Sequence, residues 1–151
     1  MKKLALLAAL AAIPTAGSAE TAIAAWQEDP TRVFATEEVV LDDLQWQLRA
    51  LVVFGRGDND PLFLEQMDLI AARADDLAVR DVIVVTDTDP DTLSELRKTL
   101  RPRSFMLALI GKDGRVAFRK PAPWDVREIS RSIDKMPLRQ QEIANRRGTD
   151  G

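Results

Sequence analysis

The stretch Ala50-Leu51-Val52-Val53-Phe54 is a continuous apolar run that is rich in β-branched residues. Such a run is typical of a strand that is buried on both faces of a sheet. A polar loop follows over 55–60, and Asp60-Pro61 then predicts a helix start, because aspartate caps the free N–H groups and proline lacks one. Apolar residues recur at helical spacing as far as Leu77, so one helix is expected from 61 to about 77.

The same signals recur along the rest of the chain. Asp89-Pro90 repeats the Asp-Pro helix start, and Asp113-Gly114 favours a tight hairpin turn. The further elements expected are strands at 82–86, 105–110 and 115–120, and helices from 90 to about 100 and from Pro123-Trp124 to about 133.

The predicted element order is β-α-β-α-β-β-α, which is an α/β fold. Two strands joined through a helix are expected to be parallel with a right-handed crossover, whereas a hairpin makes its strands antiparallel. The sequence therefore predicts a mixed four-stranded sheet with helices on both faces.

The first residues have the pattern of a secretory signal. Lys2 and Lys3 precede an apolar run over 4–13, and small residues follow at 16–19. The run is about 10 residues long, whereas a helix that crosses a bilayer needs about 20. We therefore expect residues 1–19 to be a cleaved signal peptide, with cleavage after Ala24 as the second choice. No membrane span is expected after its removal.

The remainder divides by the strength of its fold signals. Residues 20–45 are a lead-in with a short extended stretch at 32–34 and a weak helix start at Thr36, residues 46–143 form the domain, and 144–151 are expected to be a disordered tail. The chain contains no cysteine, which suits an oxidising compartment, so a periplasmic or secreted location is expected. The net charge of −3 argues against nucleic acid as a partner.

Three stretches of this domain resemble a known family. They are Arg49 to Phe54, Leu109-Ile110-Gly111-Lys112-Asp113-Gly114, and Ile133-Asp134-Lys135-Met136-Pro137-Leu138-Arg139-Gln140-Gln141-Glu142. Together they resemble a family of short exported bacterial proteins that is classed as a domain of unknown function and described as peroxiredoxin-like. Similar domains occur in animal sushi-repeat and coiled-coil-domain extracellular matrix proteins. The resemblance covers about residues 41–143.

The resemblance implies a thioredoxin-like fold and an exported location, but no established activity. Thioredoxins and peroxiredoxins use a cysteine just after the first core strand, and residues 55–60 stand there in this chain. Without a cysteine, disulfide exchange and thiol-based peroxide reduction are excluded. The absence of histidine also excludes Ser-His-Asp triads.

Carboxylates follow the first two core strands. Asp58 and Asp60 would lie near Asp87 and Asp89, because the loops after parallel strands emerge at the same sheet edge. Together with Asp91 they could hold a divalent cation such as Ca²⁺. The alternative is structural: Asp60 and Asp89 cap helices, and the other carboxylates are solvated. No other cofactor is expected.

Arginines supply the candidate ligand or partner surface. Arg101 and Arg103 precede the third strand and could form an anion-binding patch with Arg56, or a solvated turn. Arg139 lies in a segment that could dock on the domain or on a partner, such as another envelope protein.

Two classes of function remain. The first is a non-catalytic binding or structural module of the cell envelope, built on a redox-inactive thioredoxin-like scaffold. The second is an enzyme or oxidative-stress factor that uses loop carboxylates or a bound divalent metal. A fold alone does not decide between them, because function depends on the site.

Overall fold

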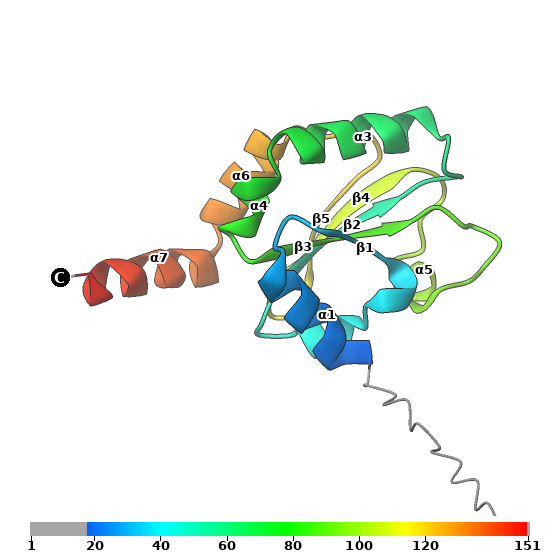
Figure 1. Ribbon diagram of the computed structural model, residues 1–151. Coiled ribbons are helices and arrows are strands. Elements are labelled where there is room, and N and C mark those ends of the chain that lie inside the picture. Colours follow the sequence, from blue (N-terminus) through cyan, green and yellow to red (C-terminus); the bar gives the residue numbers. More distant parts are fainter. Residues whose placement is uncertain (1–17, 151) are drawn as a thin grey trace, which may run out of the picture.

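The computed structural model describes residues 18–150 of the 151-residue chain, so the predicted signal peptide lies almost entirely outside the described residues (Figure 1). One mixed sheet of five strands runs through the described part. The strands are β1 (Val33–Ala35), β2 (Arg49–Phe54), β3 (Val82–Asp87), β4 (Met106–Ile110) and β5 (Val116–Lys120), in the spatial order β1-β3-β2-β4-β5.

Seven α-helices and one 3₁₀ helix connect and flank the strands in residues 18–150. They are α1 (Ser18–Glu28), the 3₁₀ helix η1 (Thr36–Glu38), α2 (Leu41–Leu44), α3 (Pro61–Ala72), α4 (Ala74–Ala78), α5 (Glu95–Leu100), α6 (Val126–Asp134) and α7 (Pro137–Thr149). The α/β class predicted from the sequence is confirmed.

The pairing directions follow the connections. β1, β3 and β2 are mutually parallel, while β4 is antiparallel to both β2 and β5. In the β4–β5 turn Gly114 has a φ of 81°, a left-handed conformation that glycine adopts without strain. The Asp-Gly signal therefore placed this hairpin correctly.

Two apolar cores lie on opposite faces of the sheet. β2 alternates between them: Val52 and Phe54 pack with α1, α2 and α5, whereas Leu51 and Val53 pack with α3, α4 and α6. Figure 1 shows α3, α4 and α6 above the sheet and α1 and α5 below it. All six residues of β2 are buried, as its continuous apolar pattern predicts for a strand covered on both faces.

The expectation of four strands is wrong, because β1, in the segment expected to be a lead-in, adds a fifth strand. β1 pairs in parallel with β3, and its Phe34 is buried. Ala22 and Trp26 of α1 are also buried, and the Trp26 indole N–H donates to the Val82 carbonyl at 3.1 Å. The segment before residue 46 therefore completes one apolar core.

The helix predicted to start at Asp89-Pro90 begins instead at Glu95. The Asp89 carboxylate accepts hydrogen bonds from the N–H groups of Asp91 and Thr92, which closes a turn rather than a helix. Ser94 is the true N-cap, since its hydroxyl accepts from the Arg97 N–H at 3.1 Å.

Other helix ends also differ from the sequence expectation. The single helix expected over 61–77 is broken at Arg73, whose φ of −139° separates α3 from α4. α6 starts at Val126 behind an Asp125 cap rather than at Pro123-Trp124. α7 continues through Thr149, so residues 144–149 are helical where a disordered tail was expected; Arg146 and Arg147 in its last turn favour the negative end of the helix dipole.

Candidate functional site

The carboxyl ends of β2 and β3 lie side by side, with Phe54 opposite Asp87. The loop over 55–60 leaves β2 there, and the loop over 88–94 leaves β3. The sequence prediction that these loops share one sheet edge is confirmed. This edge carries most of the residues singled out from the sequence.

Asp87 forms a buried ion pair with Arg97 of α5. The Arg97 Nε lies 2.8 Å from the Asp87 carboxylate, and its Nη2 donates to the carbonyls of Gly55 and Asp87 at 3.0 and 3.1 Å. The Ser94 hydroxyl donates to the other Asp87 oxygen at 2.6 Å. Arg97 therefore ties α5 to the ends of both strands, and Asp87 neutralises it.

Asp60 is the N-cap of α3, as the sequence predicts. Its carboxylate accepts from the N–H groups of Arg56 at 3.0 Å and Leu62 at 3.1 Å, and the Arg56 Nε lies 3.6 Å away. The hydrogen bond from the Arg56 N–H lowers the pKa of Asp60 below its ordinary value of 3.8. Asp60 is ionised at neutral pH, and its hydrogen bonds fix the loop over 55–60 against the start of α3.

Asp58 and Asp89 are also engaged within their loops. Asp58 accepts a hydrogen bond from the Thr88 hydroxyl, which links the two loops. The Thr92 hydroxyl lowers the pKa of Asp89 in the same way that a backbone N–H would. Within residues 18–150, no group of three or more carboxylates lies close enough together to hold a metal ion. The candidate ligands are thus placed at one edge but not around one point.

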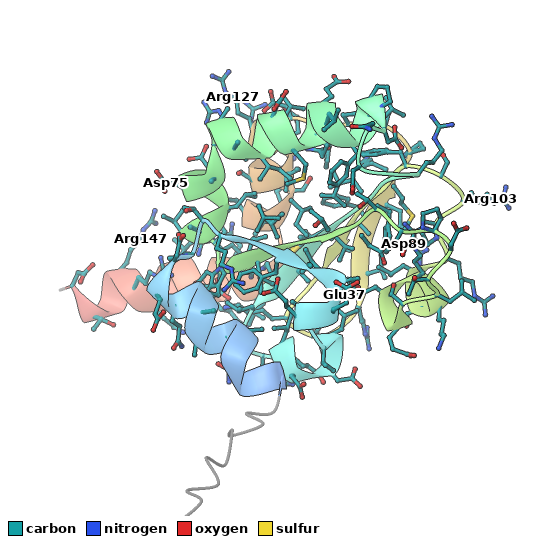
Figure 2. The ribbon with its side chains drawn as sticks, turned by 45° about the vertical axis from the view of Figure 1, so that its right-hand side comes forward. Glu37, Asp75, Asp89, Arg103, Arg127 and Arg147 are labelled. Carbon is teal, nitrogen blue, oxygen red and sulfur yellow. The ribbon has the colours of Figure 1, made fainter. Side chains whose placement is uncertain are left out.

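Four arginines of this edge line one pocket. A pocket of about 520 Å³ lies between the loops after β2 and β3, α5 and the segment before β4. Five cationic side chains and no carboxylate line it: Arg56, Arg97, Lys98, Arg101 and Arg103. We call this the basic pocket. Figure 2 shows Arg103 projecting at the same end of the molecule as Asp89 and opposite Arg147 of α7.

The cations of the basic pocket differ in how far they are neutralised. Arg97 and Arg56 face Asp87 and Asp60, and Lys98 pairs with Glu95 at 2.8 Å. Arg101 and Arg103 form no ion pair among the described residues. Both side chains are exposed at the mouth of the pocket.

Arg101 has an unusual backbone. It is the C-cap of α5 in the left-handed conformation, with a φ of 50° and a ψ of 57°. Glycine is the common residue in left-handed helix caps, and a side chain there costs about 1 kcal/mol or more. Trp46 and Asp81 also have a positive φ, so this backbone conformation marks the end of α5 and does not by itself assign a role to the Arg101 charge.

Sequence reasoning identified Arg56, Arg101 and Arg103 but missed Arg97 and Lys98. Arg97 and Lys98 lie inside the helix expected from 90 to about 100, within four positions of Arg101, and this proximity was the signal available in the sequence.

Arg139 lies elsewhere and is not at a free surface. It is buried between Asp134 and Glu142, whose oxygens lie 3.4 and 3.3 Å from its guanidinium. Glu142 also pairs with Arg49 and Lys112 at 3.2 and 2.8 Å. The three stretches quoted for the family resemblance therefore meet in one ionic network at the start of β2, where α7 is attached.

The described residues contain no helix that is long and apolar enough to cross a membrane.

The chain is similar to "Coiled-coil domain-containing protein 80" of Danio rerio. The two sequences are 26% identical over an alignment of 137 residues, and the match covers 71% of this chain. The match spans only 16% of that relative's length. Residues 40–142 match the family model described as "Domain of unknown function (DUF4174)". The residues matched include β2 to α6, the basic pocket and the ionic network, and the chain belongs to the DUF4174 family of domains of unknown function.

Proposed function

We propose that this protein is an exported, non-catalytic binding module with a thioredoxin-like fold, which holds an anionic group of an envelope partner in the basic pocket. The observation that carries the proposal is the lining of that pocket, with five cations and no carboxylate. Arg101 and Arg103 have no carboxylate partner within residues 18–150, and a guanidinium group recognises carboxylate, sulfate or phosphate oxygens.

The charge of the basic pocket is opposite in sign to the net charge of the chain. The whole sequence has a net charge of −3, yet this one concave surface is positive. A concave surface of one sign focuses the field and raises the local concentration of oppositely charged ligands. An anion would therefore be drawn to this end of the sheet in preference to the rest of the surface.

The scaffold supports binding more than catalysis. The elements from β2 to α6 follow the β-α-β-α-β-β-α order of a thioredoxin-like core, with the first helix divided into α3 and α4. The basic pocket lies after the first core strand, where thioredoxins carry their reactive cysteine. Gly55 and Arg56 stand there, and the chain has neither a cysteine nor a histidine to act as nucleophile or base.

Export is supported by the amino-terminal sequence. Lys2 and Lys3, the apolar run over 4–13 and the small residues at 16–19 form the pattern that secretion requires. A module in the periplasm or outside the cell meets anionic groups on envelope and matrix polymers, for which a surface pocket rather than a deep cavity suffices.

The test is a calorimetric titration of the mature chain, starting at Glu20, with inorganic sulfate and phosphate at low ionic strength. We expect saturable binding that weakens as salt rises. Arg103→Gln and Arg101→Gly should each weaken binding about 2- to 10-fold, as expected for one exposed charge-assisted contact.

Arg101→Gly is informative because glycine suits a left-handed cap, so the fold is expected to retain its stability. Arg115→Gln is the matched control, since Arg115 is exposed in the β4–β5 turn at the opposite edge of the sheet. Equal loss of binding in Arg115→Gln, or no saturable binding in the parent chain, would refute the proposal.

A further inference from the structure

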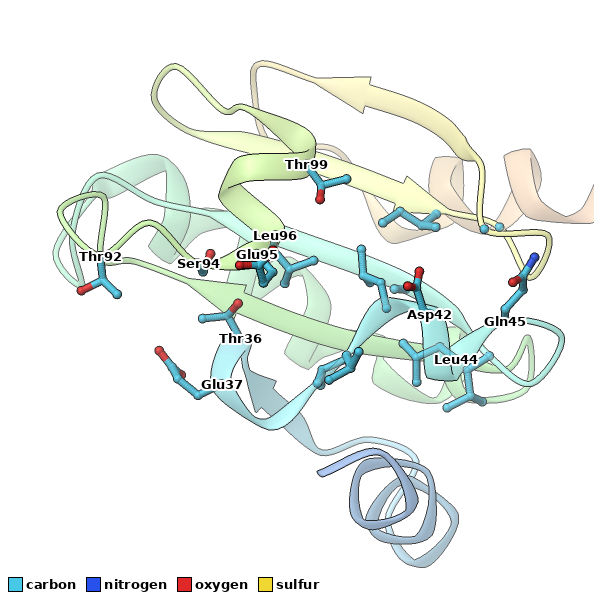
Figure 3. Close-up of a pocket in the computed structure, with 18 residues that line it drawn as sticks. Thr36, Glu37, Asp42, Leu44, Gln45, Thr92, Ser94, Glu95, Leu96 and Thr99 are labelled. Carbon is cyan, nitrogen blue, oxygen red and sulfur yellow. The ribbon is translucent and has the colours of Figure 1, made fainter. Parts of the chain in front are cut away.

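A second pocket lies on the other side of α5 from the basic pocket. It has a volume of about 600 Å³ and is bounded by η1, α2 and α5, with β2 and the end of β4 beneath (Figure 3). This volume lies within the range of sites for small organic molecules, about 300–1,000 Å³. We call it the acidic-rimmed pocket.

The floor of this pocket is apolar. Ala50 of β2 and Ile110 of β4 belong to it, together with Leu44, Leu48 and Leu96, and all five side chains are buried in the core below. Ala50 and Ile110 are opposite each other in the β2–β4 pairing, so paired strands form the centre of the floor. Such a floor favours an apolar ligand body through the hydrophobic effect.

The rim carries charge of one sign. Three carboxylates line the pocket, Glu37, Asp42 and Glu95, and no lysine or arginine does. Glu95 is paired with Lys98, but Glu37 and Asp42 form no ion pair among the described residues. Figure 3 shows Asp42 on α2 across the pocket from Thr99 on α5, with Glu37 toward the other end. A ligand that enters here meets uncompensated negative charge.

The two pockets are therefore opposite in chemistry. Five cations line the basic pocket, whereas three carboxylates border an apolar floor in the acidic-rimmed pocket. α5 separates them, since Glu95 and Thr99 face one pocket while Lys98 and Arg101 face the other. A ligand suited to one is excluded from the other by charge.

We propose that the acidic-rimmed pocket binds a small amphiphilic amine, a compound with an apolar body and one cationic amino group. The apolar body would lie on the floor formed by β2 and β4, and the ammonium group would face Asp42 or Glu37 at the rim. An uncharged apolar ligand would gain only the floor, and an anionic one would be repelled. This site is independent of anion binding in the basic pocket.

The test uses a homologous series of straight-chain primary amines from pentylamine to octylamine, titrated calorimetrically into the mature chain. Each amine is compared with the alcohol and the carboxylate of the same chain length. We expect one site per chain, affinity that rises about fourfold per added methylene until the pocket is full, and amine binding about 5- to 20-fold tighter than alcohol binding.

Variants separate the two parts of the proposal. The double variant Glu37→Gln/Asp42→Asn should bring amine binding close to alcohol binding, and each single variant should reduce the amine preference in part. Asp43→Asn is a matched control because Asp43 is an exposed neighbour outside the pocket. Thr99→Trp places a bulky side chain at the pocket wall formed by α5 and should weaken binding of every ligand in the series. Thermal unfolding of each variant verifies that it is folded.

Two results would overturn the proposal. One is an amine affinity that equals the alcohol affinity in the parent chain. The other is binding of the whole series that is as tight in folded Thr99→Trp as in the parent chain. Arg103→Gln should leave amine binding unchanged, so a failure of anion binding in the basic pocket is distinguishable from a failure here.

Discussion

Arg49 at the start of β2 and Glu142 on α7 form a two-point ion pair across a separation of 93 positions in the sequence. The two guanidinium nitrogens of Arg49 lie 3.3 and 3.2 Å from the two Glu142 oxygens. Arg49 is only 1% exposed, and its Nη1 also donates to the Arg80 carbonyl at 2.8 Å. The pair holds α7 to the sheet at a point where the arginine has no access to water.

Glu142→Gln is therefore expected to lower the free energy of unfolding by about 2–4 kcal/mol, because breaking one half of a buried pair leaves an uncompensated charge. Arg139 and Lys112 lose the same partner. Urea denaturation followed by circular dichroism measures the change. Glu128→Gln is the control: Glu128 pairs with Arg131 on the exposed face of α6, where an ion pair contributes about 0–1 kcal/mol. Equal effects of the two variants would contradict the assignment.

The same network predicts acid sensitivity. Burial raises the pKa of Glu142, but hydrogen bonds from Lys112 and Arg49 outweigh it and hold the pKa below the ordinary 4.5. The Arg80 guanidinium lowers the pKa of Asp134 below 3.8. A pKa that is lower in the folded state contributes stability above the unfolded value and loses it as the pH falls through the folded value.

We therefore expect the melting temperature to fall as the pH drops below the ordinary values of 4.5 and 3.8. Thermal unfolding recorded between about pH 6 and about pH 2.5 measures this dependence. Glu142→Gln and Asp134→Asn remove the titrating groups, so each should flatten the acid limb of the curve. An identical slope in the parent and both variants would show that other carboxylates carry the acid dependence.

Local signals account for the parts of the fold that the sequence predicted well. The apolar runs of β2 and β3 and the Asp113-Gly114 turn define their elements without reference to distant residues. Asp60-Pro61 and Asp89-Pro90 are the same local signal, but only the first starts a helix. The first is followed by an apolar helical stripe and starts α3, whereas Thr92 after the second takes the Asp89 carboxylate into a turn.

The rest depends on contacts that a sequence does not display. β1 has three residues and one buried side chain, so only its pairing with β3 identifies it as a strand. The basic pocket was half predicted, because only the packing of α5 against the ends of β2 and β3 shows that Arg97 and Lys98 line the same pocket as Arg101. Arg139 reads as a surface residue until α7 is known to pack it between Asp134 and Glu142.

Because β1 belongs to the sheet, substitutions at its buried residue Phe34 and its exposed residue Val33 are expected to differ in their effect on stability. Phe34 is 1% exposed and Val33 is 41% exposed. Phe34→Ala is expected to cost about 3–5 kcal/mol, the usual loss for a buried phenylalanine, and Val33→Ala well under half of that. Chemical denaturation of the mature chain gives both values. Similar small losses would mean that residues before 46 lie outside the cooperative fold.

Asp87 is expected to act as the partner of Arg97. Asp87→Asn should destabilise the chain by about 3 kcal/mol, because Arg97 stays buried without its counter-charge, and it should also weaken sulfate binding by loosening the basic pocket. Asp91→Asn, at an exposed position of the same loop, should change neither quantity. If Asp87 were a metal ligand instead, a chelator would lower the melting temperature of the parent to that of Asp87→Asn; we expect the chelator to leave it unchanged.

The position of α1 distinguishes the two candidate cleavage sites of the predicted signal peptide. Cleavage after Ala19 leaves both Ala22 and Trp26 in the core that α1 forms with the sheet, whereas cleavage after Ala24 removes Ala22, which is 3% exposed. Loss of that part of α1 uncovers neighbouring apolar surface and leaves Trp26 on a helix too short to hold its indole N–H against the Val82 carbonyl. The mature protein is therefore expected to begin at Glu20, as read by mass spectrometry of the protein recovered from the medium or the periplasm. A chain that begins at Ala25 should have a lower melting temperature than one that begins at Glu20. An exported protein that starts at Ala25 and is as stable as the chain from Glu20 would contradict the structural role assigned to α1.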